Sequence, residues 1–98
     1  MVEKVVGKAE VLAKFKISKS NVVAGCRVIE GEIRRNASVR VIRNDQVIHT
    51  GEVASLKREK DDVREVRAGM EFGIAIKNFN DFKIGDVIEC FVMEQFGG

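Results

Sequence analysis

Hydrophobic and charged residues alternate along much of this chain. From residue 9 to residue 17 every second side chain is apolar, most positions between them are lysine or glutamate, and Leu12 is the only break. Residues 22–29 repeat the alternation through Val22, Ala24, Cys26 and Val28. A period of two is typical of a β-strand with one buried face, so both segments are predicted to be strands.

The same alternation continues in the second half of the chain. Residues 39–43 and 46–56 are predicted to form a hairpin around Asn44-Asp45, because both turn residues tolerate a left-handed backbone. Two further strands are expected at 70–77 and 86–93. Glycine, asparagine and aspartate mark the other turns and loops, at 30–32, 35–36, 78–81 and 83–85. Only 61–67 is suited to a helical turn.

Short strands, glycine-containing turns and the absence of a helical period predict an all-β fold, and a closed barrel is favoured over a sandwich. With 98 residues the chain is expected to form a single domain, residues 1–98. No apolar run is long enough to cross a bilayer, and no signal peptide is evident, so a cytoplasmic protein is expected.

The composition argues against several kinds of chemistry. A net charge of +2 is too small for a protein that coats nucleic acid by charge alone, so any such contact is expected to be local. No Gly-x-x-x-x-Gly-Lys-Ser/Thr loop is present to bind a nucleoside triphosphate, and two cysteines with one histidine are too few for a zinc site. A Cys–His49 nucleophile lacks a supporting signature. We therefore expect no enzyme activity and no cofactor.

Residues 55–66, SLKREKDDVREV, carry more charge than a buried strand tolerates. Lys57, Arg58 and Lys60 are suited to neutralise phosphates, Arg58 by a two-pronged grip. The alternative is a solvated loop in which neighbouring acids balance these cations, and charge alone favours that alternative. For the second basic cluster a solvated face is the stronger interpretation; its members are Arg34, Arg35, Arg40 and Arg43.

In the strand at 70–77, Met70 and Phe72 share one face and Glu71 and Gly73 the other. Phe72 is predicted to lie in the core, and an outward Gly73 would let another molecule approach the backbone, although a bulge would equally explain the glycine. Both cysteines fall on apolar faces. Cys90 is taken as a small buried hydrophobe. The same interpretation is the default for Cys26, and the alternative is that Gly25 beside it opens the barrel wall there.

Several segments together resemble the C-terminal domain of bacterial translation initiation factor 2, and the resemblance covers nearly the whole chain. The most specific are the Lys57 to Val66 run and Lys77-Asn78-Phe79-Asn80-Asp81. The others are Val23-Ala24-Gly25-Cys26, Ile42-Arg43, Gly69 to Gly73 and Gly85-Asp86-Val87-Ile88-Glu89.

The resemblance implies a six-stranded antiparallel closed β-barrel similar to domain 2 of elongation factor Tu. It implies the last module of a multidomain GTPase whose nucleotide domain is absent from this chain. The implied function is to recognise the formylmethionyl acceptor end of initiator tRNA and to help place the tRNA on the ribosome, as a monomer without a membrane contact. The implied tRNA- and formylmethionine-binding residues are Cys26, Lys57, Arg58, Lys60, Glu71 and Gly73, and we add Phe72 to the expected site.

Two positions depart from the family pattern. Glu59 stands where an aromatic residue is usual, and Phe72 stands where a second cysteine is usual. We expect a groove near Cys26, Met70 and Phe72 to take the methionine side chain, and Glu71 to pair with Arg58 or Lys57. The alternative function is a structural or interaction barrel that docks on ribosomal RNA or on a partner domain and ignores the amino acid.

Overall fold

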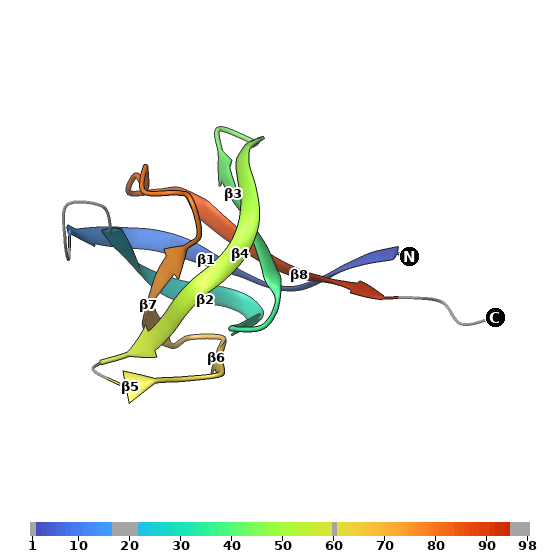
Figure 1. Cartoon of the computed structure of the whole chain (residues 1–98), viewed down its shortest axis with the longest axis horizontal. Coiled ribbons are helices and arrows are strands. Elements are labelled where there is room, and N and C mark those ends of the chain that lie inside the picture. Colours follow the sequence, from blue (N-terminus) through green and yellow to red (C-terminus); the bar gives the residue numbers. More distant parts are fainter. Residues whose placement is uncertain (1, 17–21, 60, 95–98) are drawn as a thin grey trace.

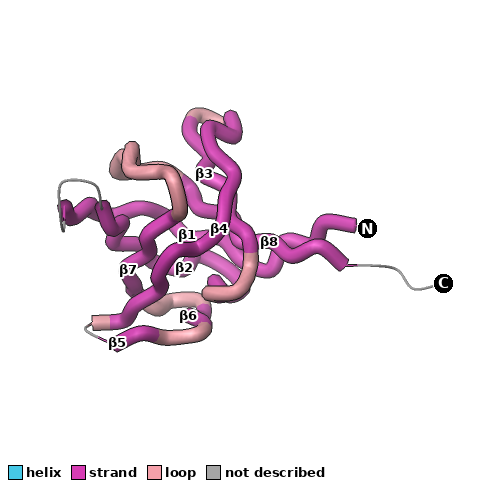
Figure 2. The backbone as a smooth tube through the Cα atoms, in the orientation of Figure 1, coloured by secondary structure: helices cyan, strands magenta, loops and turns pink. Residues whose placement is uncertain are grey.

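A computed structural model describes residues 2–16, 22–59 and 61–94 of the chain (Figures 1 and 2). The described part is built from strands, turns and loops, and it contains no helix of the length and apolarity needed to cross a bilayer. The strands are β1 (Val2–Lys16), β2 (Val22–Arg34), β3 (Ser38–Arg43), β4 (Gln46–Arg58), β5 (Asp61–Asp62), β6 (Glu65–Arg67), β7 (Glu71–Ile76) and β8 (Val87–Glu94).

Six of the strands close into an antiparallel barrel, as predicted. The hydrogen-bonded order runs β1-β8-β3-β4-β7-β2, and pairing of β1 with β2 completes the ring. The two short strands lie outside the ring, with β5 on β4 and β6 on β2 (Figure 1). Closure leaves the barrel strands without a free edge along the paired region.

The barrel interior is filled by apolar side chains from alternate strand positions. Phe72 and Cys90 belong to this core, as the alternation predicted. Asp86 is the buried charged residue in the described part of the chain. The largest fully buried side chains are Phe82, Ile33, Leu56, Ile74, Ile88, Val11, Val28, Val39, Val41 and Val66.

The predicted turn at 30–32 is wrong, because β2 continues through it. Gly31 takes a left-handed φ of 66°, and a Cβ there would lie 2.1 Å from the Val6 carbonyl oxygen of the paired strand. The glycine therefore permits a sharp local bend and a close approach to β1 without ending the strand. The turns at 35–36 and 44–45 are confirmed, the second with φ of 54° and 62° at Asn44 and Asp45.

The possible helical turn at 61–67 is also wrong. Those residues form β5, a bend and β6. The Val63 amide donates to the Leu56 carbonyl at 3.0 Å, and the Arg35 amide donates to the Arg64 carbonyl at 2.8 Å. The backbone of this segment thus forms hydrogen bonds with β4 and with the residue after β2, and not within itself as a helical turn would. The side chain of Val66 is also fully buried, so an extended conformation is favoured.

Three of the four arginines of the second basic cluster have partners within the fold, contrary to the solvated face that was expected, whereas Arg35 is exposed as expected. The Arg43 guanidinium grips the buried Asp86 carboxylate through Nε and Nη2, at 2.9 and 2.7 Å. Arg40 lies over the Phe91 ring beside Glu89, and Arg34 binds Glu32. These guanidinium groups are therefore engaged inside the domain.

Burial by itself would raise the pKa of Asp86. Hydrogen bonds from Arg43 and from the Lys83 backbone amide outweigh burial and hold the pKa below its usual value. The same Arg43 side chain donates to the Asp81 carbonyl at 2.8 Å. One guanidinium thus fastens the loop before β8 to the β3–β4 hairpin.

Candidate functional site

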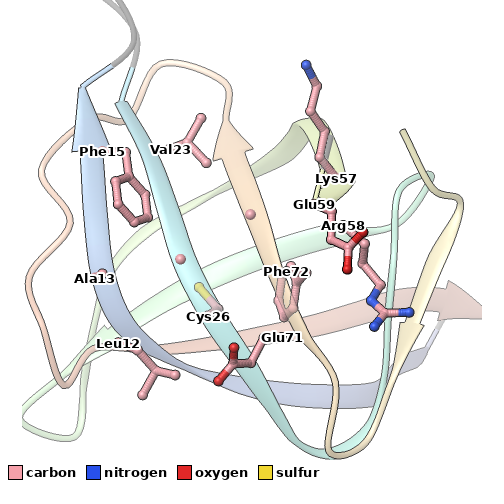
Figure 3. Close-up of a pocket in the computed structure, with 12 residues that line it drawn as sticks. Leu12, Ala13, Phe15, Val23, Cys26, Lys57, Arg58, Glu59, Glu71 and Phe72 are labelled. Atoms are coloured by element: carbon pink, nitrogen blue, oxygen red, sulfur yellow. The ribbon is translucent and has the colours of Figure 1, made fainter. Parts of the chain in front are cut away.

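An open groove of about 680 Å³ lies on the outer wall of the barrel, over β1, β2, β7 and the end of β4 (Figure 3). The site residues expected from the sequence line it except Met70, and Lys60 lies outside the described residues. The lining residues are Leu12, Ala13, Phe15, Val23, Gly25, Cys26, Lys57, Arg58, Glu59, Glu71, Phe72 and Gly73. Segments far apart in the sequence therefore meet at one surface.

The floor of the groove consists mainly of small residues. Ala13 of β1 pairs with Gly25 of β2, and Gly25 pairs with Gly73 of β7. Gly73 pairs in turn with Lys57 of β4. No register shift occurs at Gly73 in either ladder, so the bulge that the sequence left open is not the reason for this glycine. The two glycines instead make room for neighbouring side chains, because a Cβ on Gly25 would lie 3.0 Å from Phe15 Cε2 and one on Gly73 would lie 3.0 Å from Val23 Cγ1.

Leu12 and Phe15 form the wall of the groove on the β1 side (Figure 3). A β-bulge between Val11 and Ala13 interrupts the alternation of β1 at Leu12. The extra residue turns the following side chains to the opposite face. Phe15, which the simple alternation placed with the core, is therefore 59% exposed, and Leu12 is 42% exposed.

Cys26 and Phe72 are cross-strand partners beneath the groove floor. Their exposed fractions are only 1% and 5%, so both are core residues first and border the groove from below. Burial raises the pKa of the Cys26 thiol to about 12. A thiol of this kind stays protonated at neutral pH and is a poor nucleophile.

His49 does not assist the Cys26 thiol. The Cys26 thiol donates to the Ala24 carbonyl at 3.6 Å, whereas the His49 ring stacks on Phe79 with centroids 4.8 Å apart. No group of three metal-ligating side chains occurs among the residues that the structure places. The Cys26 thiol and the His49 ring thus have separate partners in the fold.

The β4 side of the groove carries the charged residues Lys57, Arg58 and Glu59. Figure 3 shows them on the opposite side from Leu12 and Phe15. Within residues 2–16, 22–59 and 61–94, neither Lys57 nor Arg58 forms an ion pair. Glu59 follows with a left-handed φ of 58°. Two cations next to an apolar floor thus remain free to neutralise a ligand.

Glu71 lies at the edge of the groove with an exposed side chain. The expected pairing of Glu71 with Arg58 or Lys57 is wrong, since the described side chains contain no such ion pair. Register explains the difference: Lys57 lies opposite Gly73, and Glu71 lies opposite Arg27. The Glu71 carboxylate is available to accept a hydrogen bond from a ligand.

Met70 does not line the groove as expected. It precedes β7, its carbonyl accepts a hydrogen bond from the Val28 amide at 3.0 Å, and its side chain is 38% exposed. Leu12, Phe15 and Val23 were not predicted as site residues. The break at Leu12 was the signal for two of them, because a break in strict alternation marks a candidate bulge.

A family model and known proteins of similar sequence both relate this chain to translation factors. The family model for elongation factor Tu domain 2 matches residues 21–89. Translation initiation factor IF-2 of Geobacillus thermodenitrificans is 56% identical over 93 residues, which are 95% of this chain and 13% of that protein. The protein of the same name from Thermodesulfovibrio yellowstonii is 56% identical over 94 residues, 95% of this chain and 12% of that protein.

The chain thus spans about an eighth of the length of these relatives. Among solved structures, GDP-bound aIF5B from Aeropyrum pernix superposes with a TM-score of 0.62 at 20% identity, over 86% of this chain and 14% of that one, which supports the fold. The matched region of the relatives is a β-barrel domain and not a GTPase domain. This chain belongs to the elongation factor Tu domain 2 family and is homologous to a domain of translation initiation factor IF-2.

Proposed function

We propose that the groove binds the formylmethionyl acceptor end of initiator tRNA. The observation that carries the proposal is the convergence of residues from β2, β4 and β7 on one groove, with a floor of small residues and two cations that form no ion pair with any described side chain. An apolar surface beside cations suits a ligand with an apolar group at the end of a phosphate chain. High identity to proteins named as translation initiation factors supports a ligand from translation.

In this proposal the methionine side chain lies against Leu12, beside the Phe15 and Val23 side chains that lie next to Gly25 and Gly73. Leu12 takes the place that we expected Met70 to fill, because the bulge in β1 exposes its side chain at the groove. Cys26 and Phe72 limit the depth of the site from below. Burial of apolar surface on both partners stabilises the complex by about 25 cal/mol per Å² before the costs of association.

Formylation matters because it removes a charge. A free α-amino group titrates near pH 7.7–8.0 and is largely cationic at neutral pH, whereas the formylated nitrogen is a neutral amide. Moving an ammonium from water to an apolar groove costs several kcal/mol, and one carboxylate at the exposed edge of the groove, that of Glu71, offsets this cost only in part. Glu71 accepts a hydrogen bond from the formamide N–H, while the backbone exposed at Gly73 lies beside the formyl group.

Lys57 and Arg58 contact the sugar-phosphate chain of the acceptor end. Arg58 can grip one phosphate with two parallel hydrogen bonds, and Lys57 acts as a point charge. Lys60 keeps its predicted phosphate contact as part of this proposal. Glu59 opposes the contact, since a carboxylate beside the two cations lowers the local positive potential.

In the larger factor, the barrel is the C-terminal module of a multidomain translational GTPase and acts as a monomer. It holds the aminoacylated end, shields the ester from water and helps to place the tRNA on the ribosome. This module needs no cofactor for these tasks. Catalysis of nucleotide hydrolysis belongs to another domain.

The test is the rate of spontaneous ester hydrolysis of formylmethionyl-tRNA and of methionyl-tRNA, each with and without the chain. Selective protection of the formylated ester is expected, because the bound ester is shielded from water. Equal protection of both esters would remove formyl recognition from the proposal. Protection of neither would favour the alternative, a barrel that docks on ribosomal RNA or on a partner domain without recognising the amino acid.

A further inference from the structure

We propose that Phe15 is a stacking platform for the terminal nucleobase of the groove's ligand. The inference rests on the proposed function and adds a residue and a ligand group to it. A nucleic-acid end is held by cations on its phosphates and by aromatic faces on its bases. The groove supplies both, on opposite sides.

Phe15 is exposed to an extent that the barrel itself does not require. Its side chain is 59% exposed, although a phenylalanine gains about 1.5–3 kcal/mol from full burial. The β1 bulge moves it out of the core pattern and onto the outer wall. A large aromatic exposed at the edge of a groove is typical of a binding surface.

The Phe15 ring can occupy its position because Gly25, on the neighbouring strand β2, has no side chain. A Cβ on Gly25 would lie 3.0 Å from Phe15 Cε2, so the ring rests against bare backbone of β2. Val23 lies directly opposite Phe15 in the β1–β2 ladder (Figure 3). The ring is thus supported from β2 while most of its surface faces solvent.

Phe15 is also the aromatic residue that the described groove lining offers to a ligand. Phe72 is 5% exposed and cannot present its face, and the position after Arg58 is Glu59. The cations lie across the floor, because Ala13, Gly25, Gly73 and Lys57 follow one another in register over four adjacent strands. At about 4.8 Å per strand this row spans about 14 Å, which leaves room for a base at Phe15 and its phosphate near Lys57.

Two small ligands separate the base from the amino acid. One is adenosine with a formylmethionyl group joined by an amide to a 3′-amino group, which resists hydrolysis. The other is the methyl ester of N-formylmethionine, which has no base. Binding of both is measured by calorimetry to the chain and to three variants: Phe15→Leu, Phe15→Trp and the control Ile84→Ala. Ile84 is 72% exposed and does not line the groove.

The adenosine ligand is expected to bind the unaltered chain about 5- to 150-fold more tightly than the methyl ester, the range that one base–aromatic stack provides. Phe15→Leu should abolish most of this difference without weakening the methyl ester, while Phe15→Trp and Ile84→Ala should preserve it. Because Phe15 is exposed, its variants are expected to fold, which thermal unfolding verifies.

Four results would overturn the inference. Equal loss of both ligands in Phe15→Leu would mean that the ring contacts the amino acid and not the base. No loss of either would remove Phe15 from the site. Equal affinity of the unaltered chain for both ligands would leave the proposed function standing without a base contact, whereas binding of neither ligand would overturn the proposed function and this inference together.

Discussion

Gly25 of β2 and Gly73 of β7 lie directly opposite each other in an antiparallel ladder, and both face the outer wall of the barrel. Neither glycine has a left-handed φ, so the backbone conformation does not require glycine at either position. Both positions instead lack space for a side chain. A Cβ on Gly25 would lie 3.0 Å from Phe15 Cε2, and a Cβ on Gly73 would lie 3.0 Å from Val23 Cγ1. The pair therefore makes room for the Phe15 ring and the Val23 side chain at the groove floor.

Gly73→Ala is therefore expected to weaken binding of formylmethionyl-tRNA by about 5- to 150-fold. This range corresponds to a cost of about 1–3 kcal/mol for fitting an extra methyl group between the groove floor and the ligand. Its free energy of unfolding should change by only about 0.5 kcal/mol, since Val23 is a side chain that can yield. Ala75→Val is the control, because Ala75 lies on the same outer face of β7 but outside the groove. Filter binding and urea unfolding check both variants; unchanged binding by Gly73→Ala would show that the ligand does not use the floor.

Arg58→Ala should weaken RNA binding and flatten its dependence on salt. Loss of one phosphate contact lowers the slope of log K against log salt by about 0.7 for a single strand. The measurement is the affinity for the acceptor end between low and moderate salt. Arg67→Ala provides the comparison, because Arg67 is exposed, pairs with Glu65 and lies away from the groove. An unaltered slope in Arg58→Ala would exclude Arg58 from the phosphate contact.

Glu71→Gln separates recognition of the amide from attraction of the ammonium. Glutamine keeps an oxygen that accepts a hydrogen bond but loses the charge, so formylmethionyl-tRNA should bind within about threefold of the unaltered chain. Methionyl-tRNA should bind more weakly, because its cation loses a favourable carboxylate. Competition binding with both tRNAs gives the ratio. Tighter binding of methionyl-tRNA by the variant would show that Glu71 disfavours the amine in the unaltered chain by an effect other than its charge. Unchanged affinity for both tRNAs would remove Glu71 from the site.

Asp86→Asn is expected to destabilise the barrel by about 3 kcal/mol, since it leaves Arg43 without its buried carboxylate partner. The pKa of Asp86 is lowered in the folded state, so its contribution is fully present above the unfolded pKa of about 3.9 and is lost as pH falls below that value. Urea unfolding from pH 7 to pH 2.5 should show this acid-dependent loss in the unaltered chain and a smaller loss in Asp86→Asn.

Asp81→Asn is the matched control for that experiment. Asp81 faces the same guanidinium at 3.4 Å, but its side chain is 72% exposed. A surface carboxylate of this kind contributes little to stability, so the free energy of unfolding should change by less than about 0.5 kcal/mol. Equal losses of unfolding free energy in both variants would mean that burial of Asp86 does not determine the strength of its ion pair with Arg43.

Cys26 and Cys90 should resist iodoacetamide at pH 8 until the barrel opens. Both thiols are buried, and burial raises the pKa of each, for Cys26 to about 12. Reactive thiolate is therefore scarce, and access requires unfolding. Mass spectrometry of the labelled chain with and without urea gives the rates. Rapid labelling of Cys26 in the native chain would contradict the assignment of Cys26 to the core.

Sequence periodicity was sufficient to predict the barrel strands, because alternation directly reports which face is buried. The hairpin at Asn44-Asp45 and the core position of Phe72 followed from the same reasoning. Errors arose where a strand is irregular. One extra residue at Leu12 reverses the faces of the residues that follow, so Phe15 could not be placed on the groove by parity.

Long-range partners set the remaining limits of prediction. Arg43 looked like a solvated cation because its carboxylate, Asp86, is 43 residues away in the sequence. The segment at 61–67 looked suited to a helical turn because its strand partners belong to β4 and β2. The site residues on β2, β4 and β7 came from the family resemblance, and no single segment contained the spatial information that joins them.

Closure of the barrel fixes the width of the groove. Its floor crosses four strands whose separations are fixed by backbone hydrogen bonds, so the distance between the β1 wall and the β4 wall cannot adapt to a larger ligand. Selectivity among ligands of the groove must then come from the rim side chains, which can change without disturbing the core. A domain of this design can acquire a new ligand preference by exchanging a few exposed residues while its folding remains the same.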